Sequence, residues 1–175
     1  MAGKRVPHDP DEVIAIINNR DEVIGKATRR EAHKDRSMHR VAAVIIRNRN
    51  DELLLQQRSD DSLLDYSAGG HFRWDMTPIE GAVKETYEEL GINIPALMFR
   101  RVGSWTIPGN PLHMFTVFEV IGNWGLDDFN IDTKEVKSIR YYTIPEIREM
   151  LQSSRRAFTS GFRYSLKRYI EAAGI

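Results

Sequence analysis

Short apolar runs alternate with turn-forming residues along most of the chain, which is typical of β-hairpins. Residues 12–29 hold two apolar runs around Asn-Asn-Arg-Asp, and residues 40–58 hold two more around Asn-Arg-Asn-Asp. Because Asn and Asp favour turns, each segment predicts a hairpin. Residues 30–39 are polar and predict a short helix or loop, and residues 59–70 predict a loop ending in paired glycines. Further strands are expected over residues 99–107, 113–122 and 136–144.

Residues 77–91 carry the clearest helix boundaries in the chain. Thr77 can cap the first turn, Pro78 suits the first helical position, and Glu80 stands three residues after Thr77. This arrangement is a capping box, and Gly91 is a suitable residue to end the helix.

Two later segments also predict helices. Thr143 and Glu146 repeat the capping pattern over residues 143–151. Residues 160–174 are amphipathic, and their apolar positions at helical spacing are Phe162, Leu166, Tyr169 and Ile170. A strand-rich body with two or three helices predicts an α+β fold with a mixed or antiparallel sheet.

Composition narrows the classes of function without naming one. The chain has 175 residues, 25 Lys and Arg against 25 Asp and Glu, and no cysteine. The balanced charge gives no whole-molecule argument for binding nucleic acid or an anionic membrane, and the missing cysteine excludes disulfides and thiolate chemistry. The polar first residues lack the apolar core of a signal peptide, and no apolar run approaches a membrane span of about 20 residues. We therefore expect a cytoplasmic protein.

Three carboxylates stand close together on the helix at residues 77–91. Glu85, Glu88 and Glu89 lie on a stripe largely opposite an apolar one, whose members are Ile79, Ala82, Val83, Thr86 and Leu90. The simplest interpretation is a solvated face, on which Glu88 pairs with Lys84. The alternative is a divalent cation, because Mg²⁺ prefers oxygen ligands and would turn repulsion into attraction.

The surrounding residues favour the cation. Residues 70–92 resemble the Nudix box, G-x5-E-x7-R-E-U-x-E-E-x-G-U, where U is a bulky aliphatic residue. The matching positions are Gly70, Glu85, Glu88, Glu89, Gly91 and Ile92. The resemblance extends from about residue 12 onward, and the N-terminal residues 11–29 resemble the extension found in the branch close to isopentenyl diphosphate isomerase. It implies an α/β/α sandwich of Nudix type, with a tail at 1–11, an N-terminal β-hairpin extension at 12–40 and a Nudix domain at 41–175.

Three positions depart from the box. Met76 stands where the first Glu is expected, Lys84 replaces Arg, and Thr86 takes an aliphatic place. In the family the first Glu and the Arg support the metal site as a pair, so their joint change avoids an unpaired buried charge. We expect Met76 to fill the gap as an apolar side chain and Thr86 to bond to a backbone carbonyl.

The resemblance implies hydrolysis of a diphosphate in a nucleoside diphosphate linked to another moiety, with Mg²⁺ or Mn²⁺. It implies metal ligands at Gly70, Glu85, Glu88 and Glu89, with the three glutamates also catalytic. Metal ions suit this chemistry because bare carboxylates would repel a diphosphate.

Other residues near the box are candidates with weaker support. Glu135 can supply a further catalytic base or be a solvated loop charge, and Glu119 can point toward the site or toward water. Arg58 can grip a phosphate in the substrate or lie at the surface. Phe72 and Trp74 can stack on a substrate base, although packing in or beside the core is the commoner use of aromatic side chains.

Two other functions compete with hydrolysis. His33, His39 and His71 fall near positions where the isomerases hold a metal with imidazoles, but the isomerase cysteine corresponds to Gly69 here. We expect these histidines to be solvated or capping side chains. The other alternative is an inactive Nudix domain that binds a nucleotide or a protein, for which Met76 and Lys84 are the evidence.

The sequence does not name the substrate. Selectivity is expected in the N-terminal extension and in loops such as residues 104–114. The expected partner is a small-molecule diphosphate, without membrane or nucleic acid. The extra hairpin can cover a sheet edge or pair across a homodimer, and we favour the homodimer.

Overall fold

The sheet is organised around β3 (His39–Arg47), a strand with almost no exposed residue. The computed structural model describes residues 9–107 and 110–175. β3 pairs in parallel with β8 (Asn110–Ile121) over nine residue pairs, from His39↔His113 to Arg47↔Ile121. It also pairs antiparallel with β4 (Leu53–Arg58) and β6 (Ala68–Gly70). β7 (Arg100–Ile107) continues the sheet beyond β8, and β9 (Val136–Tyr142) and β5 (Leu64–Asp65) continue it beyond β4.

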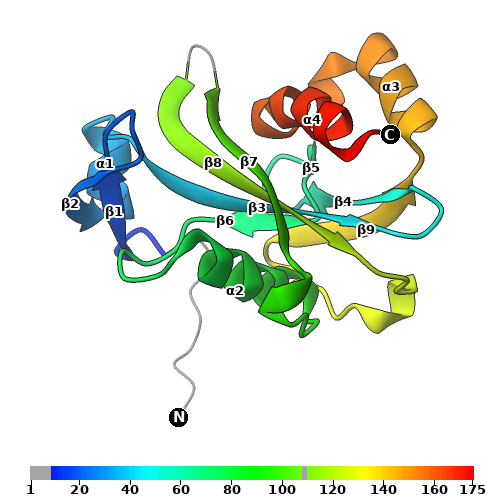
Figure 1. The fold of residues 1–175 in the computed structure, drawn as a ribbon, viewed down its shortest axis with the longest axis horizontal. Helices are drawn as coiled ribbons and strands as arrows, with labels where there is room; N and C mark the ends of the chain where they lie inside the picture. Colours follow the sequence, from blue (N-terminus) through cyan, green and yellow to red (C-terminus); the bar gives the residue numbers. More distant parts are fainter. Residues whose placement is uncertain (1–8, 108–109) are drawn as a thin grey trace.

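Helices cover both faces of this curled, mixed sheet, so that the molecule has three layers (Figure 1). Side chains alternate between the faces of a strand. Ala43 and Ile45 therefore pack toward α3 (Ile144–Ser153) and α4 (Ser160–Ala173), while Val44 and Ile46 pack toward α2 (Pro78–Leu90). The 3₁₀ turns are Ala96–Met98, Leu126–Asp128 and Arg155–Ala157. This arrangement confirms the predicted α+β fold, with a mixed sheet between helices.

The N-terminal extension forms a separate group of elements at one end of the sheet (Figure 1). It contains the predicted hairpin, β1 (Val13–Ile17) and β2 (Val23–Thr28), followed by α1 (Arg29–Lys34). β1 joins the main sheet through the single register pair Ile16↔His39. β2 forms an edge of the sheet and exposes Val23 and Ile24. The predicted homodimer stays a prediction. Most of the predicted tail, residues 1–8, lies outside the described residues.

The predicted loop at residues 59–70 is wrong in part, because it contains β5 and β6. β5 pairs with β4 at Gln57↔Leu64, and β6 pairs with β3 at Ala43↔Gly69. Both strands are too short to show an alternating pattern, and their pairing depends on backbone groups that the sequence does not reveal. None of the helices in the described part is both long and apolar enough to span a membrane.

Candidate active site

α2 presents its glutamates to the glycine-rich strand β6. The helix begins after Thr77, whose side chain accepts from the Glu80 amide, and it ends at Gly91 with a left-handed φ of 67°. These caps are the predicted ones. α2 packs on β6 and β3, and the absence of a side chain at Gly70 leaves room for the carboxylate of Glu85, whereas Gly69 lies close to the backbone of β3 at Ala42.

The interpretation of a solvated carboxylate face is wrong for two of the three glutamates. Glu85 and Glu89 are only 5% and 3% exposed, whereas Glu88 is partly exposed. The apolar stripe is buried as expected at Ala82 and Leu90. The helix therefore buries residues on two sides, one in the hydrophobic core and one against β6.

Backbone and side-chain donors fix the carboxylate of Glu89. Its Oε2 atom accepts from the Gly69 amide at 3.0 Å and from Nε2 of Gln56 at 3.0 Å. The other amide atom of Gln56, Oε1, is buried and has no hydrogen-bond partner in the described structure. The amide oxygen of Gln56 therefore lies beside the buried carboxylate of Glu89 without a hydrogen-bond donor in the described structure.

Burial shifts the protonation of this pair. Burial, with the nearby charges of Glu88 and Glu135, raises the pKa of Glu85 to about 7, although Lys84 opposes the shift. Burial and the charge of Glu85 raise the pKa of Glu89 well above its ordinary value. Two buried carboxyl groups that repel each other are harder to ionise than exposed ones, and a bound cation would oppose this effect.

The three positions that depart from the box fit their surroundings. Met76 is partly buried against the core cluster beside α2, and the hydroxyl of Thr86 donates to the Ala82 carbonyl at 2.8 Å. Both arrangements were predicted. Nζ of Lys84 donates to Oε1 of Glu85 and to Oε2 of Glu88, each at 2.9 Å, which confirms the predicted pairing with Glu88. Lys84 thus spans two of the glutamates.

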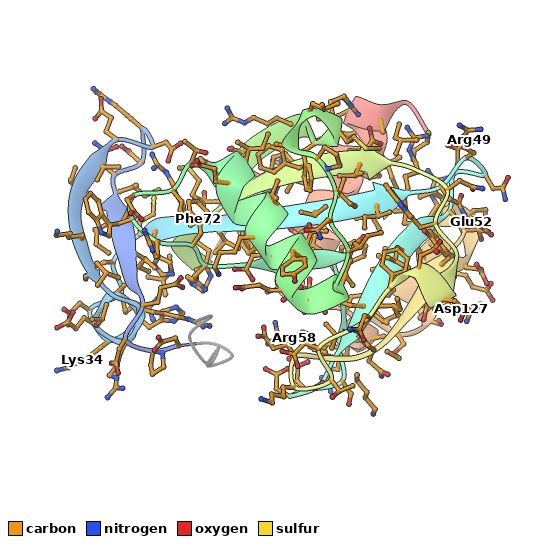
Figure 2. The ribbon with its side chains drawn as sticks, turned by 90° about the horizontal axis from the view of Figure 1, so that it is seen from below. Lys34, Arg49, Glu52, Arg58, Phe72 and Asp127 are labelled. Atoms are coloured by element: carbon orange, nitrogen blue, oxygen red, sulfur yellow. The ribbon has the colours of Figure 1, made fainter. Side chains whose placement is uncertain are left out.

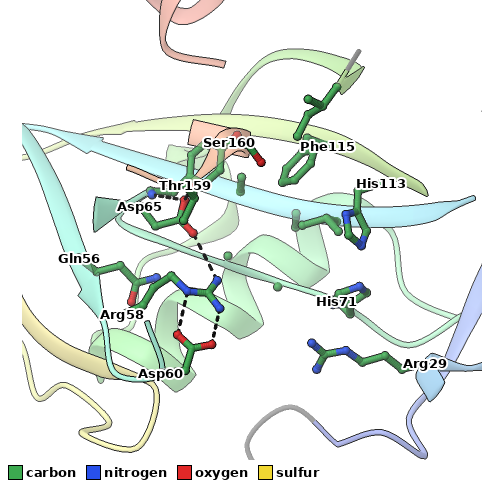
Figure 3. Close-up of a pocket in the computed structure, with 18 residues that line it drawn as sticks. Arg29, Gln56, Arg58, Asp60, Asp65, His71, His113, Phe115, Thr159 and Ser160 are labelled. Atoms are coloured by element: carbon green, nitrogen blue, oxygen red, sulfur yellow. Dashed lines mark hydrogen bonds and ion pairs between the residues drawn. The ribbon is translucent and has the colours of Figure 1, made fainter. Parts of the chain in front are cut away.

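A pocket of about 420 Å³ opens beside the glycines of β6 (Figure 3). Its size suits a small-molecule ligand. Gly70 and Gln56 line it together with two cationic side chains, Arg29 and Arg58. Arg58 is held by Asp60, with a distance of 2.6 Å between Nη2 and Oδ2. Sequence reasoning missed Arg29, which precedes the polar stretch assigned to a short helix or loop and carries no motif.

The loop acid Glu135 lies near the glutamates of α2. It is buried, its charge contributes to the raised pKa values of Glu85 and Glu89, and its carbonyl accepts from the Ser59 amide at 2.9 Å. Its predicted role as a further base remains a prediction, but a solvated loop charge does not describe it.

The two aromatic candidates lie away from the lining of the pocket. Phe72 is buried in the core cluster beside α2 and contacts the backbone at Gly81 (Figure 2). Trp74 is exposed, and Nζ of Lys26 lies 4.4 Å from the centre of its ring. The structure thus favours packing for Phe72 over stacking on a substrate.

Glu119 points neither to the site nor to water. Its carboxylate is 1% exposed and accepts from Tyr169, Arg47 and Arg100, with the Tyr169 hydroxyl at 2.7 Å. It belongs to a buried polar network between β8 and α4.

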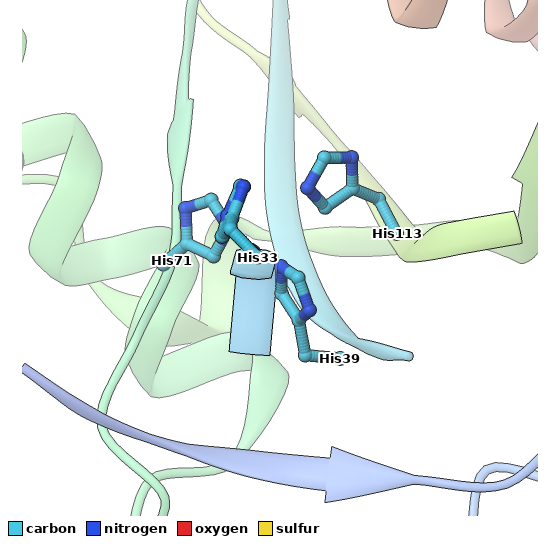
Figure 4. A group of neighbouring side chains, drawn as sticks. All are labelled: His33, His39, His71 and His113. Carbon is cyan, nitrogen blue, oxygen red and sulfur yellow. Dashed lines mark hydrogen bonds between the residues drawn. The ribbon is translucent and has the colours of Figure 1, made fainter. Parts of the chain in front are cut away.

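Four histidines gather at the end of the sheet next to the extension (Figure 4). They are His33, His39, His71 and His113, and one ring nitrogen from each lies within 4.8 Å of the others. The expectation of solvated or capping histidines is wrong for His39, which is completely buried within this cluster, whereas His33 is exposed. Burial lowers the pKa of His39 and of His113 to about 4, so both rings are neutral at pH 7. His113 was not singled out in the sequence.

Comparison with known proteins gives the family context of this geometry. The model of the NUDIX domain matches residues 37–162, which is most of the chain. Nudix hydrolase 3 of Arabidopsis thaliana is 29% identical over 148 residues, covering 74% of this chain. The match spans 19% of the plant protein.

Two further similarities cover nearly all of the chain. An isopentenyl-diphosphate Delta-isomerase of Pectobacterium atrosepticum is 26% identical over 165 residues, covering 89% of each chain. A crystal structure from Deinococcus radiodurans superposes with a TM-score of 0.73 at 22% identity, covering 90% of this chain and 99% of that one. At this identity the structural likeness shows a shared fold.

Proposed function

Because this chain belongs to the Nudix hydrolase family, we propose that it hydrolyses a diphosphate bond in a nucleoside diphosphate linked to another moiety, using Mg²⁺ or Mn²⁺. The observation that carries the proposal is the burial of Glu85 and Glu89 against β6, beside a pocket of ligand size. The proposed substrate is a small molecule, and we place the reaction in the cytoplasm.

The residues present fit a hard divalent cation. Glu85, Glu88 and Glu89 offer carboxylate oxygens, Gly70 can offer its carbonyl, and the idle Oε1 atom of Gln56 is a further oxygen nearby. Mg²⁺ and Mn²⁺ prefer oxygen ligands, and a cation would offset the repulsion that raises the two buried pKa values. When bound, the metal supplies charge neutralisation on the diphosphate and activates water.

The side chains around the glutamates supply positioning and proton transfer. Gln56 and the Gly69 amide orient Glu89, and Lys84 orients Glu85 and Glu88. We assign Glu85, which is buried against β6 beside Lys84, as a metal ligand or as the base that orients the attacking water. We assign Glu135 as a further base in the same carboxylate group.

Two arginines in the pocket lining are the candidates for contacting a diphosphate, and Asp60 and Asp65 line the pocket beside them. Arg58 and Arg29 both line the pocket, and the charge of Arg29 acts on Glu85 and Glu135. We propose that Arg58 binds a substrate phosphate, with Asp60 holding its guanidinium in place.

The local geometry argues against isomerisation, despite the isomerase relative. Gly69 stands where that family has its cysteine, and a Cβ atom at Gly69 would lie 2.7 Å from the Ala42 carbonyl oxygen. Such a contact with the backbone of β3 excludes any larger side chain unless the strands shift. A glycine cannot protonate an alkene, so the isomerase function is not proposed.

The first test is phosphate release from a panel of nucleoside diphosphate derivatives by the purified protein. We expect turnover with Mg²⁺ or Mn²⁺ and none with excess chelator, because the carboxylates alone repel the substrate. Nucleoside monophosphates lack the diphosphate bond and serve as the matched control. Tight nucleotide binding without turnover in either metal would favour the inactive binding domain.

Gly70→Ala should lower activity with little loss of stability. The added Cβ atom would lie 2.5 Å from Oε2 of Glu85 and force that carboxylate to move. We expect kcat/KM to fall roughly 10–100-fold, the usual effect of disturbing the support of a metal site. Steady-state kinetics and thermal unfolding measure the two effects.

Gly25→Ala is the matched control, because a Cβ atom at Gly25 has nothing within 4 Å. Unchanged kinetics in Gly70→Ala would contradict a role for the present position of Glu85.

A further inference from the structure

The structure assigns a second metal site to His33, His39, His71 and His113: we propose that these four imidazoles bind one Zn²⁺ and fasten the N-terminal extension to the Nudix domain. The ligands come from α1, the first residue of β3, the segment after β6, and β8 (Figure 4). This site shares no ligand with the carboxylates and does not depend on hydrolysis, although His71 and His113 line the same pocket as Gly70.

The four rings surround a common centre. The distances between ring centres all fall between 4.7 Å, for His39 and His113, and 5.5 Å, for His71 and His113. Four points with nearly equal separations form a tetrahedron, which is the geometry that Zn²⁺ adopts in structural sites.

The nitrogen atoms are also close to their required spacing. Tetrahedral Zn–N bonds of about 2.0–2.1 Å place the ligating nitrogens about 3.3 Å apart. Nε2 of His71 lies 3.3 Å from Nε2 of His33 and 2.9 Å from Nε2 of His39. Small ring rotations are therefore enough to seat the ion.

Hydrogen bonding alone leaves this cluster poorly satisfied. Nδ1 of His39 donates to the Ser37 carbonyl at 2.7 Å, so Nε2 of this neutral ring holds a lone pair directed at His71. A neutral His71 has one proton on Nε2 at most and cannot serve both His39 and His33. Nε2 of His113 is buried without a hydrogen-bond partner in the described structure. One cation would bind the ring-nitrogen lone pairs that receive no hydrogen bond within the cluster.

The donor type selects the metal. The four donors are neutral imidazoles, and the group contains neither a carboxylate nor a thiolate. Imidazole suits Zn²⁺, whereas Mg²⁺ and Ca²⁺ require oxygen. The carbonyl of Ser37 fixes His39 in the tautomer that ligation through Nε2 requires, as outer-shell partners do at zinc sites.

A closed set of four protein ligands leaves no position for substrate, which is typical of structural zinc. Sheet pairing already fixes His39 and His113, which form a register pair between β3 and β8, and His71 directly follows the paired strand β6. His33 is the ligand that comes from the extension, on a helix of six residues. The ion therefore adds a cross-link to a backbone connection that consists of the register pair Ile16↔His39 and the bridge Ile14↔Arg73, with the Trp74 amide donating to the Val13 carbonyl.

Calorimetric titration of the chelator-treated full chain with Zn²⁺, in saturating Mg²⁺, tests the site. We expect one equivalent of tight zinc, and loss of that binding in His33→Gln and in His113→Gln. His8→Gln keeps the four imidazoles and should bind as the wild type does. Glu89→Gln keeps the cluster while disturbing the carboxylate site, and should also retain zinc.

Any other pattern overturns the assignment. Absent zinc binding, or zinc binding that persists in both cluster variants, shows that the imidazoles form no site. Zinc binding lost in Glu89→Gln instead places the ion on the carboxylates. None of these outcomes depends on turnover, so failure here and failure of the hydrolase proposal are distinguishable.

Thermal unfolding and hydrogen exchange test whether zinc ties the N-terminal extension to the Nudix domain. Ligand binding at 100 times Kd should raise Tm by roughly 5–10 °C for a chain of this size. Zinc should also slow amide hydrogen exchange in residues 29–39. Both effects should vanish in His33→Gln, whose replaced side chain is exposed and leaves the core intact. Equal protection by zinc in this variant would contradict the cross-link.

Discussion

Glu89→Gln is expected to lower kcat/KM for metal-dependent hydrolysis by about 100-fold or more, the scale of losing one charge-stabilising group at an active site. Glutamine has the shape of glutamate, and its oxygen can still accept from the Gly69 amide and from Gln56. The loss therefore isolates the negative charge that would hold the cation. Steady-state kinetics in Mg²⁺ measure it.

The same variant should be more stable than the wild type when metal is removed. The pKa of Glu89 is raised in the folded state, so its ionised form opposes folding above the unfolded value of about 4.5. The stability of chelated wild type should fall as pH rises from there, and Glu89→Gln should reduce this fall. Glu171→Gln, on exposed α4 surface, is the control for both measurements. Retained activity in Glu89→Gln would remove Glu89 from the proposed site.

Glu119→Gln should lower the free energy of unfolding by about 2–4 kcal/mol, because it leaves partly buried charge without its partner. The Glu119 carboxylate accepts from Arg100 at 2.7 Å, from Arg47 at 3.0 Å and from Tyr169 at 2.7 Å. Glutamine retains an acceptor but loses the ionic component. Urea unfolding of the chelated protein at pH 7 measures the change.

The pKa shift of Glu119 determines how the stability difference between wild type and Glu119→Gln changes with pH. The Tyr169 hydroxyl and the two arginines lower the pKa of Glu119, although burial opposes them. The stabilisation is therefore present above the unfolded pKa of about 4.5 and is lost as pH falls through the lower folded value. The difference between wild type and Glu119→Gln should shrink in that range. Glu149→Gln alters an exposed carboxylate and should change stability by less than about 0.5 kcal/mol. A similarly small effect for Glu119→Gln would contradict the network.

Local signals in the sequence were sufficient for the elements that carry the box. Thr77 and Gly91 mark the ends of α2 because capping depends on residues within one turn of the helix. The resemblance of residues 70–92 to the Nudix box then identified the candidate carboxylates. These predictions required no knowledge of the rest of the chain.

Predictions about what surrounds those residues were weaker. Helical periodicity treats the polar face as solvated, but the bare backbone of Gly70 leaves room for the buried Glu85, and the Gly69 amide donates to the buried Glu89. The histidine cluster depends on the parallel pairing of β3 with β8, which joins segments more than 70 residues apart. No local pattern reports such a register, so His113 could not be identified beforehand.

The long pairing of β3 with β8 also limits how this chain can change its length. His113 and Glu119 both belong to β8, and each meets its partners only in the present register with β3. One residue inserted between them would turn one end of the strand to the opposite face, so that either the imidazole cluster or the buried network would be lost. Insertions and deletions should instead accumulate at exposed turns such as Arg49–Asp51 between β3 and β4. The two ends of β8 are therefore tied to one another in evolution and in engineering, although they serve different purposes.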